Sequence, residues 1–205
     1  MDYYDISPTI SPRIGVWPGD IGFRRDVAMS FAGGDHLELS SINTTLHVGA
    51  HADAPIHYRA DGCDMASRSL HYYIGPCQVM RVEPERGGRI YPHHLKEIKA
   101  PRILFHTGSF PDPESWNADF CSLSPELVHY LSEKGVILVG IDTPSVDPQN
   151  SKVLESHNAI ADKDMAVLEG IVLEEVPENV YNLVAPPLKL EAADASPVRA
   201  VLLPN

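Results

Sequence analysis

Short apolar runs broken by proline and glycine dominate the pattern of hydrophobic and polar positions along this chain. Several runs span only a few residues and are rich in β-branched side chains, which is typical of buried strands. The 18 prolines separate these runs and mark the boundaries of short elements. The pattern predicts strands at Leu37–Leu39, Asn43–Val48, Cys77–Val82, Arg102–His106, Val136–Ile141 and Val198–Leu203.

Helical signals lie between some of the predicted strands. Ser124 is a good N-cap and Pro125 suits the first helical position, so we expect a helix over Pro125–Lys134. Shorter helices are expected over Pro92–Lys99 and from about Glu155. Strands dominate the first half, and mixed strands and helices follow. This order predicts one α/β or α+β domain over residues 1–205 and leaves the topology open.

The composition is that of an ordinary globular protein, with 43% apolar and 21% charged residues. A formal net charge of −12 without a basic cluster repels phosphate backbones and anionic lipid. We therefore expect neither nucleic acid nor a membrane surface as a partner. The longest apolar stretch is too short to span a bilayer, and the acidic N-terminus does not resemble a signal peptide.

The three cysteines are widely spaced and form no CxxC pair. An odd number of isolated cysteines favours reduced thiols in a cytoplasmic protein. The same pattern argues against a zinc site built from cysteine. We expect each thiol to behave as a small apolar group.

Four potential metal ligands are concentrated in one short segment. His47, His51, Asp53 and His57 fall within eleven residues. Gly49 permits a sharp turn inside this segment, which makes a helical site implausible. Each residue alone could simply form hydrogen bonds in a polar loop. Three imidazoles and a carboxylate together favour a metal site carried by a loop, because these are the donors that zinc and neighbouring transition metals accept.

Two further candidate ligands lie far downstream. His157 opens a polar segment, and Glu169 interrupts the apolar run Met165–Leu173. A carboxylate buried among apolar side chains is costly unless it is paired or bound to a metal. The alternative places Glu169 on the exposed side of an amphipathic turn, and the sequence leaves both readings open.

The segment from His47 to His57 resembles the HxGTHxDxPxH signature of the cyclase-like metal hydrolases. Within that family, the chain resembles the bacterial kynurenine formamidases from about Asp5 to Leu203. The long signature is specific, and shorter similar blocks follow in the same order. These blocks are Val16–Asp20, Leu104–Gly108, Gly140–Pro148, Leu154–His157 and Leu168–Gly170.

The resemblance implies a fold of the swivelling β/β/α type, with a central mixed sheet or barrel flanked by helices, and a homodimer. It also implies two divalent ions per chain, usually zinc, although manganese and cobalt accept the same donors. Asp53 and Glu169 become the expected bridging ligands. His57 becomes the general acid and base, and Trp17 a substrate contact. The implied metal ligands are His47, His51, Asp53, His157 and Glu169.

For function, the resemblance implies an arylformamidase that hydrolyses N-formylkynurenine to kynurenine and formate in tryptophan catabolism. Its partner would be a small aromatic formamide. One alternative is another hydrolase of the same family, which opens a cyclic amide or an isatin-like ring at the same metal site. A second alternative is a metal-binding relative without turnover. His57 argues against the second, because a storage site needs no imidazole beyond its ligands.

Overall fold

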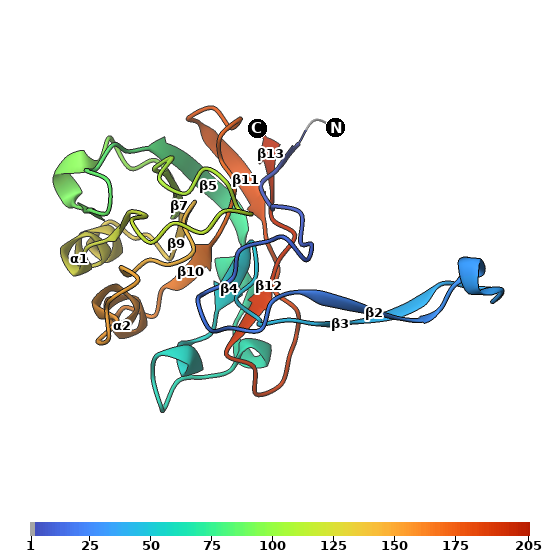
Figure 1. The fold of residues 1–205 in the computed structure, drawn as a ribbon. Helices are drawn as coiled ribbons and strands as arrows, with labels where there is room; N and C mark the ends of the chain where they lie inside the picture. Colours follow the sequence, from blue (N-terminus) through green and yellow to red (C-terminus); the bar gives the residue numbers. More distant parts are fainter. Residues whose placement is uncertain (1–2) are drawn as a thin grey trace.

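A curled, mixed β-sheet forms the centre of the computed structural model, which describes residues 3–205 (Figure 1). Its nine strands lie in the order β1-β13-β11-β5-β7-β9-β10-β4-β12. Their bounds are Tyr4–Asp5 (β1), His51–Asp53 (β4), Ile74–Arg81 (β5), Arg102–His106 (β7), Leu138–Ile141 (β9), Ala166–Glu169 (β10), Val180–Val184 (β11), Ala195–Pro197 (β12) and Val201–Pro204 (β13).

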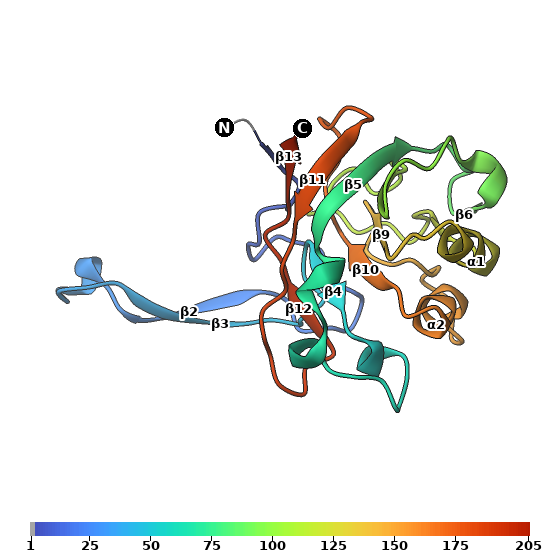
Figure 2. The ribbon, with the colours of Figure 1, turned by 180° about the vertical axis from the view of Figure 1, so that it is seen from behind.

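The middle of the sheet is parallel and its flanks are antiparallel. β5, β7, β9 and β10 run parallel to one another, whereas β4 pairs antiparallel with both β10 and β12. All five residues of β7 are buried, as expected for a parallel strand that is covered on both faces. The strands curl into a half-barrel (Figure 2).

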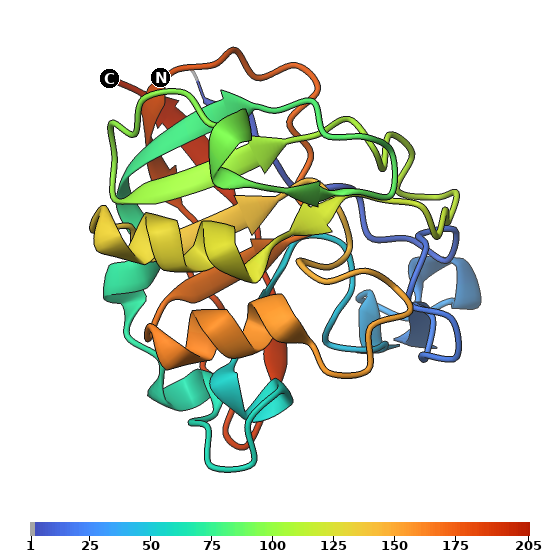
Figure 3. The ribbon, with the colours of Figure 1, turned by 90° about the vertical axis from the view of Figure 1, so that its left-hand side faces the viewer.

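Two helices, α1 (Pro125–Glu133) and α2 (Glu155–Asp162), lie side by side on one face of the sheet (Figure 3). The Ser124 side chain caps α1 by accepting a hydrogen bond from the Leu127 N–H at 3.1 Å. Leu127 and Leu131 recur at helical spacing and are fully buried, so α1 packs on the sheet along one stripe. A second apolar core fills the opposite, concave face of the sheet.

A long hairpin projects from this body into solvent (Figure 1). It consists of β2 (Arg24–Met29) and β3 (Leu39–Asn43), which pair only with each other. A smaller pair joins β6 (Arg89–Ile90) and β8 (Ser122–Leu123). Short 3₁₀ turns occupy Phe31–Gly33, Pro55–His57, Met65–Ser67, Leu70–Tyr72 and Pro92–His94.

The structure confirms the expected α+β class, with a mixed sheet flanked by helices. β7 and α1 lie where the sequence predicts them. Two strand predictions are wrong: Leu37–Leu39 and Asn43–Val48 flank the true strand β3, and His47 lies in a bent segment after it. The hairpin is exposed on both faces, so no alternation of burial marks its register.

The helix expected over Pro92–Lys99 is also wrong, because only a 3₁₀ turn forms at Pro92–His94. Leu95 is already extended and ends it. Within residues 3–205 no helix combines the length and the apolar character that crossing a bilayer requires.

Candidate metal centre

The pairing of β4 with β10 places three of the candidate ligands on one face of the sheet. His51 and Asp53 are two residues apart on β4, so their side chains point to the same side. Glu169, the last residue of β10, is the direct cross-strand partner of His51. These three residues are each at most 2% exposed, so their charged groups lie inside the protein.

Two glycines allow this close approach. Gly49 turns the chain just before β4 with φ = +58°, and Gly170 follows Glu169 with φ = +64°. A Cβ atom on Gly170 would lie 2.2 Å from the carbonyl oxygen of Gly49. Only glycine therefore lets the two segments pass at this distance.

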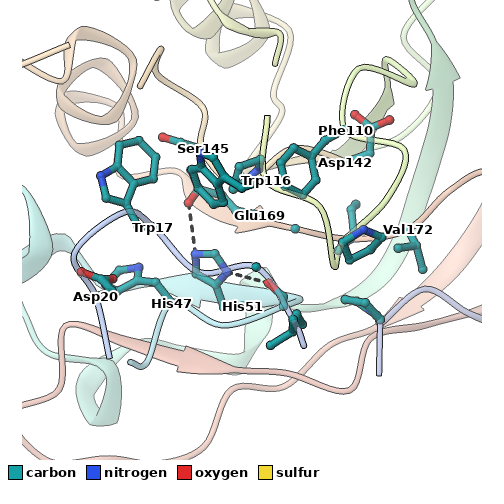
Figure 4. Close-up of a pocket in the computed structure, with 18 of the residues that line it drawn as sticks. Trp17, Asp20, His47, His51, Phe110, Trp116, Asp142, Ser145, Glu169 and Val172 are labelled. Carbon is teal, nitrogen blue, oxygen red and sulfur yellow. Dashed lines mark hydrogen bonds and ion pairs between the residues drawn. The ribbon is translucent and has the colours of Figure 1, made fainter. Parts of the chain in front are cut away.

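His157 and His47 complete the cluster from other segments. α2 carries His157, whose Nε2 lies 3.4 Å from Asp53 Oδ2 and 3.3 Å from Glu169 Oε1. His47 Nδ1 lies 3.0 Å from Asp53 Oδ1. His51 Nε2 lies 3.2 Å from Glu169 Oε2 and 3.5 Å from Asp53 Oδ1. All five candidate ligands thus face one small volume; Figure 4 labels His47, His51 and Glu169 there.

The hydrogen bonds at this centre test whether the residues fit a metal. His51 Nε2, His157 Nε2 and both carboxylate oxygens of Asp53 are buried without any hydrogen-bond partner among the described residues. Leaving one buried polar atom unpaired costs about 1–3 kcal/mol. Four such atoms that converge, all imidazole nitrogens or carboxylate oxygens, match the donor set of a divalent transition metal.

In His47, His51 and His157, the ring nitrogen that points away from the cluster has a hydrogen-bonding partner. His51 Nδ1 lies 2.8 Å from the Gly49 carbonyl oxygen, and His157 Nδ1 lies 2.8 Å from Asp147 Oδ2. His47 Nε2 lies 2.9 Å from Asp194 Oδ2. Such outer contacts fix the ring orientation and aim the free nitrogen inward, as is usual for metal-binding histidines. The residues present therefore fit a metal centre.

Charge at the centre points the same way. Burial would raise the pKa of Asp53, but His47 and His157 outweigh it and hold that pKa well below its usual range. Burial would lower the pKa of His47, but Asp53 and Asp194 raise it to about 10. The carboxylates therefore create a strong negative field that favours a cation among them.

His57 stands at the edge of the centre. It ends the 3₁₀ turn Pro55–His57, its side chain is 32% exposed, and its ring centroid lies 4.2 Å from that of His47. Burial, aided by the neighbouring imidazoles, lowers the pKa of His57, so the ring is neutral at pH 7. A partly exposed, neutral imidazole can take up and release a proton. Its donor atom also groups with those of His47 and Asp53, so the geometry permits a ligand role as well.

A cavity of about 360 Å³ opens from the cluster, and His47, His51, His57, His157 and Glu169 line it. Its apolar wall contains Trp17, Trp116 and Phe110 (Figure 4). The Trp17 and Trp116 rings meet edge to face at 5.5 Å between centroids. Trp17 is half-buried on this wall, where its ring is accessible to a bound molecule.

Sequence reasoning missed several residues that shape this site. Asp147 and Asp194 orient ligand rings, and Trp116 and Phe110 supply two of the three rings of the aromatic wall. Asp147 lies in the block Gly140–Pro148 that resembles the family, which was the only available signal for it. His106, for which the sequence suggested no role, lies outside the cavity with its Nε2 3.4 Å from Glu174 Oε2.

Comparison with known proteins identifies the family. A family model described as "Putative cyclase" matches residues 4–148. A solved structure of a potential metal-dependent hydrolase with cyclase activity is 25% identical, with a TM-score of 0.83 over 98% of this chain and 96% of that one. A predicted metal-dependent hydrolase from Bacillus stearothermophilus is 26% identical, with a TM-score of 0.82 over 98% and 97% of the two chains.

Isatin hydrolase A from Labrenzia aggregata shares the fold, with a TM-score of 0.80 at 20% identity over 98% of this chain and 93% of that one. The family match spans most of the chain and includes the segment from His47 to His57. The chain therefore belongs to the cyclase family, and it is a metal-dependent hydrolase of the cyclase-like type. The sequence prediction of this family is confirmed.

Proposed function

We propose that this enzyme is an arylformamidase that hydrolyses N-formylkynurenine to kynurenine and formate, a step of tryptophan catabolism. One observation supports this most directly: an aromatic wall of Trp17, Trp116 and Phe110 borders the cavity that contains the His and carboxylate cluster. An aryl formamide fits this arrangement. Its flat ring can pack on the aromatic wall, and its small formyl group can reach the buried cluster.

The ligands of the proposed centre are His47, His51, Asp53, His157 and Glu169. We propose that they hold two divalent ions, with zinc the first choice and manganese or cobalt as alternatives. When bound, such ions lower the pKa of a water and polarise the carbonyl group under attack. Five ligands with two carboxylates exceed what one tetrahedral ion requires, which supports two ions.

Side chains of the protein then orient the substrate ring and transfer the protons. Trp17 and Trp116 orient the aryl ring by edge and face contacts. As the water oxygen bonds to the formyl carbon, His57 accepts the water proton. As the C–N bond breaks, its electron pair stays on the aryl nitrogen and His57 returns the proton there. Protonation matters because an aniline anion is a poor leaving group.

A second candidate, opening of a cyclic amide such as isatin, is favoured by the shared fold of the isatin hydrolases. The deciding experiment compares N-formylkynurenine with isatin on metal-replete protein by absorbance. We expect kcat/KM for N-formylkynurenine to be at least a hundredfold higher. A reversed preference would leave the metal-dependent hydrolase in place and replace the proposed substrate.

We also propose that the protein is a cytoplasmic homodimer. The β2–β3 hairpin supports the dimer, because it exposes Val27, Phe31, Leu39 and Ile42, each at least 51% accessible. A two-stranded hairpin is only marginally stable alone in water. A second copy of the chain that covers these side chains would stabilise it. The three free cysteines support a reducing compartment.

A further inference from the structure

Lys152 is the one lysine or arginine that lines the cavity among the described residues, beside the imidazoles of the proposed site. Carboxylates of Asp20, Asp142 and Glu169 also line it, and the protein as a whole carries a net charge of −12. Of these, Asp20 and Asp142 lie outside the proposed metal ligands and would repel a ligand carboxylate, whereas Lys152 would attract it. The position of this lysine therefore bears on which substrates the cavity accepts.

Lys152 is free to bind a ligand. It is exposed and forms no ion pair within 4 Å with any carboxylate of residues 3–205. Glu155, its neighbour along the chain, is already engaged by Arg89 at 3.0 Å and by the Ser151 hydroxyl at 2.9 Å. Asp142 accepts hydrogen bonds from Thr107 and Gly108. The carboxylates of Glu155 and Asp142 thus already have other partners.

The loop that carries Lys152 is fixed beside the metal centre. The Ser151 N–H donates to the Pro148 carbonyl at 2.9 Å, and the Ser151 hydroxyl accepts from the Leu154 N–H at 3.0 Å. Leu154 adopts φ = +49°, which is unfavourable for a branched side chain. Strain of this kind persists where the surroundings enforce it, often at ligand sites. α2 begins directly after this residue and carries His157, so the loop with Lys152 leads straight into the helix that holds a proposed metal ligand.

We propose that Lys152 binds the α-carboxylate of the substrate and selects amino-acid-bearing aryl formamides over simple ones. This inference rests on the proposed function, since it concerns the side chain of N-formylkynurenine. The aromatic wall contacts the ring alone and cannot distinguish the two classes. A lysine at the cavity can, because its ammonium group attracts a carboxylate and gains nothing from a neutral substituent.

The test compares two substrates on metal-replete enzyme: N-formylkynurenine and N-(2-acetylphenyl)formamide, which keeps the aryl ketone and lacks the amino-acid group. For Lys152→Met we expect KM for N-formylkynurenine to rise about two- to fivefold with kcat nearly unchanged, the range of an exposed ion pair. KM for the simple formamide should not change. Lys152→Glu should give a larger rise, and Lys152→Arg should restore most of the affinity.

Lys163→Met provides the control. Lys163 is an exposed lysine at the end of α2 that does not line the cavity, and its loss changes the net charge equally. Equal effects of Lys152→Met and Lys163→Met would overturn the inference in favour of overall charge. Equal losses on both substrates would overturn it in favour of a packing role. Failure of the wild-type enzyme to hydrolyse N-formylkynurenine, with turnover of the simple formamide intact, would instead refute the proposed function.

Discussion

At the scale of single residues, the site separates groups that can bind a metal from a group that can move a proton. His51 is buried, lacks a partner at Nε2 and is oriented through Nδ1 by the Gly49 carbonyl. His57 is partly exposed at the rim of the same cluster. Their surroundings therefore suit different tasks, although both residues come from one short segment.

This division can be tested by two alanine substitutions. His57→Ala should lower kcat about a hundredfold to ten-thousandfold, the usual contribution of a positioned acid and base, and should leave the metal content unchanged. His51→Ala should lose metal. Turnover assays with elemental analysis of both variants check this. Loss of metal from His57→Ala would make His57 a ligand, as its grouping with His47 and Asp53 allows.

Trp17 offers a second test at this scale, because its half-buried ring has two interpretations. If it stacks on the substrate ring, Trp17→Ala should weaken transition-state binding of N-formylkynurenine by about 1–3 kcal/mol. A formamide without an aromatic group should be little affected. If the ring mainly packs against Trp116 and Phe120, the variant should lose melting temperature and turn over both substrates equally less well. Kinetics on both substrates and a thermal melt distinguish the two.

At the scale of elements, the sequence predicts features that depend on nearby residues and does not predict those that depend on the pairing of distant strands. The segment from His47 to His57 predicts a metal site from the sequence alone, because its candidate ligands are close in sequence around Gly49. The residues next to Glu169 in the sequence could not show whether its side chain is buried in the site or exposed to solvent. That depends on the pairing of β10 with β4, a strand far away in the chain, and only the resemblance linked the two. Trp116 comes from an irregular loop without any pattern, so no signal marked it.

The contact between Gly170 and Gly49 yields a prediction for these elements. Gly170→Ala places a methyl group 2.2 Å from the Gly49 carbonyl oxygen and should push β10 away from β4. Gly135→Ala is the matched control, because Gly135 also has a positive φ but nothing within 4 Å of a new Cβ. The control should cost about 1–2 kcal/mol of stability, the price of the backbone conformation alone. Gly170→Ala should cost more in thermal melts and should also reduce metal content, and equal effects would contradict this account.

At the scale of the whole molecule, the metal should contribute to folding as well as to chemistry. The buried cluster draws its ligands from β4, α2, β10 and the bend before β4, so a bound ion would tie together segments distant in sequence. A ligand that binds only the folded state stabilises it by about 4 kcal/mol at a thousandfold excess over Kd. For a chain of this size that corresponds to a melting temperature higher by roughly 8–16 °C.

Chelation tests this coupling. Elemental analysis should find two ions per chain, and removing them with a chelator should abolish activity and lower the melting temperature by that amount. Added zinc or manganese should restore both. His51→Ala should show little of the thermal shift on adding metal. Full activity in protein that contains no metal would contradict the proposed centre.

The projecting β2–β3 hairpin leads to a prediction about dimer formation. Phe31 and Ile42 are 63% and 66% exposed on a projecting arm whose two strands pair only with each other, and burying such side chains against a second copy would be favourable. The double variant Phe31→Ser, Ile42→Glu should therefore shift the protein from dimer to monomer in size-exclusion chromatography with light scattering. Leu188→Glu, which changes a side chain 59% exposed elsewhere on the surface, is the control and should remain dimeric. A wild-type protein that is monomeric at micromolar concentration, or a double variant that stays dimeric, would show that the arm does not hold two copies together.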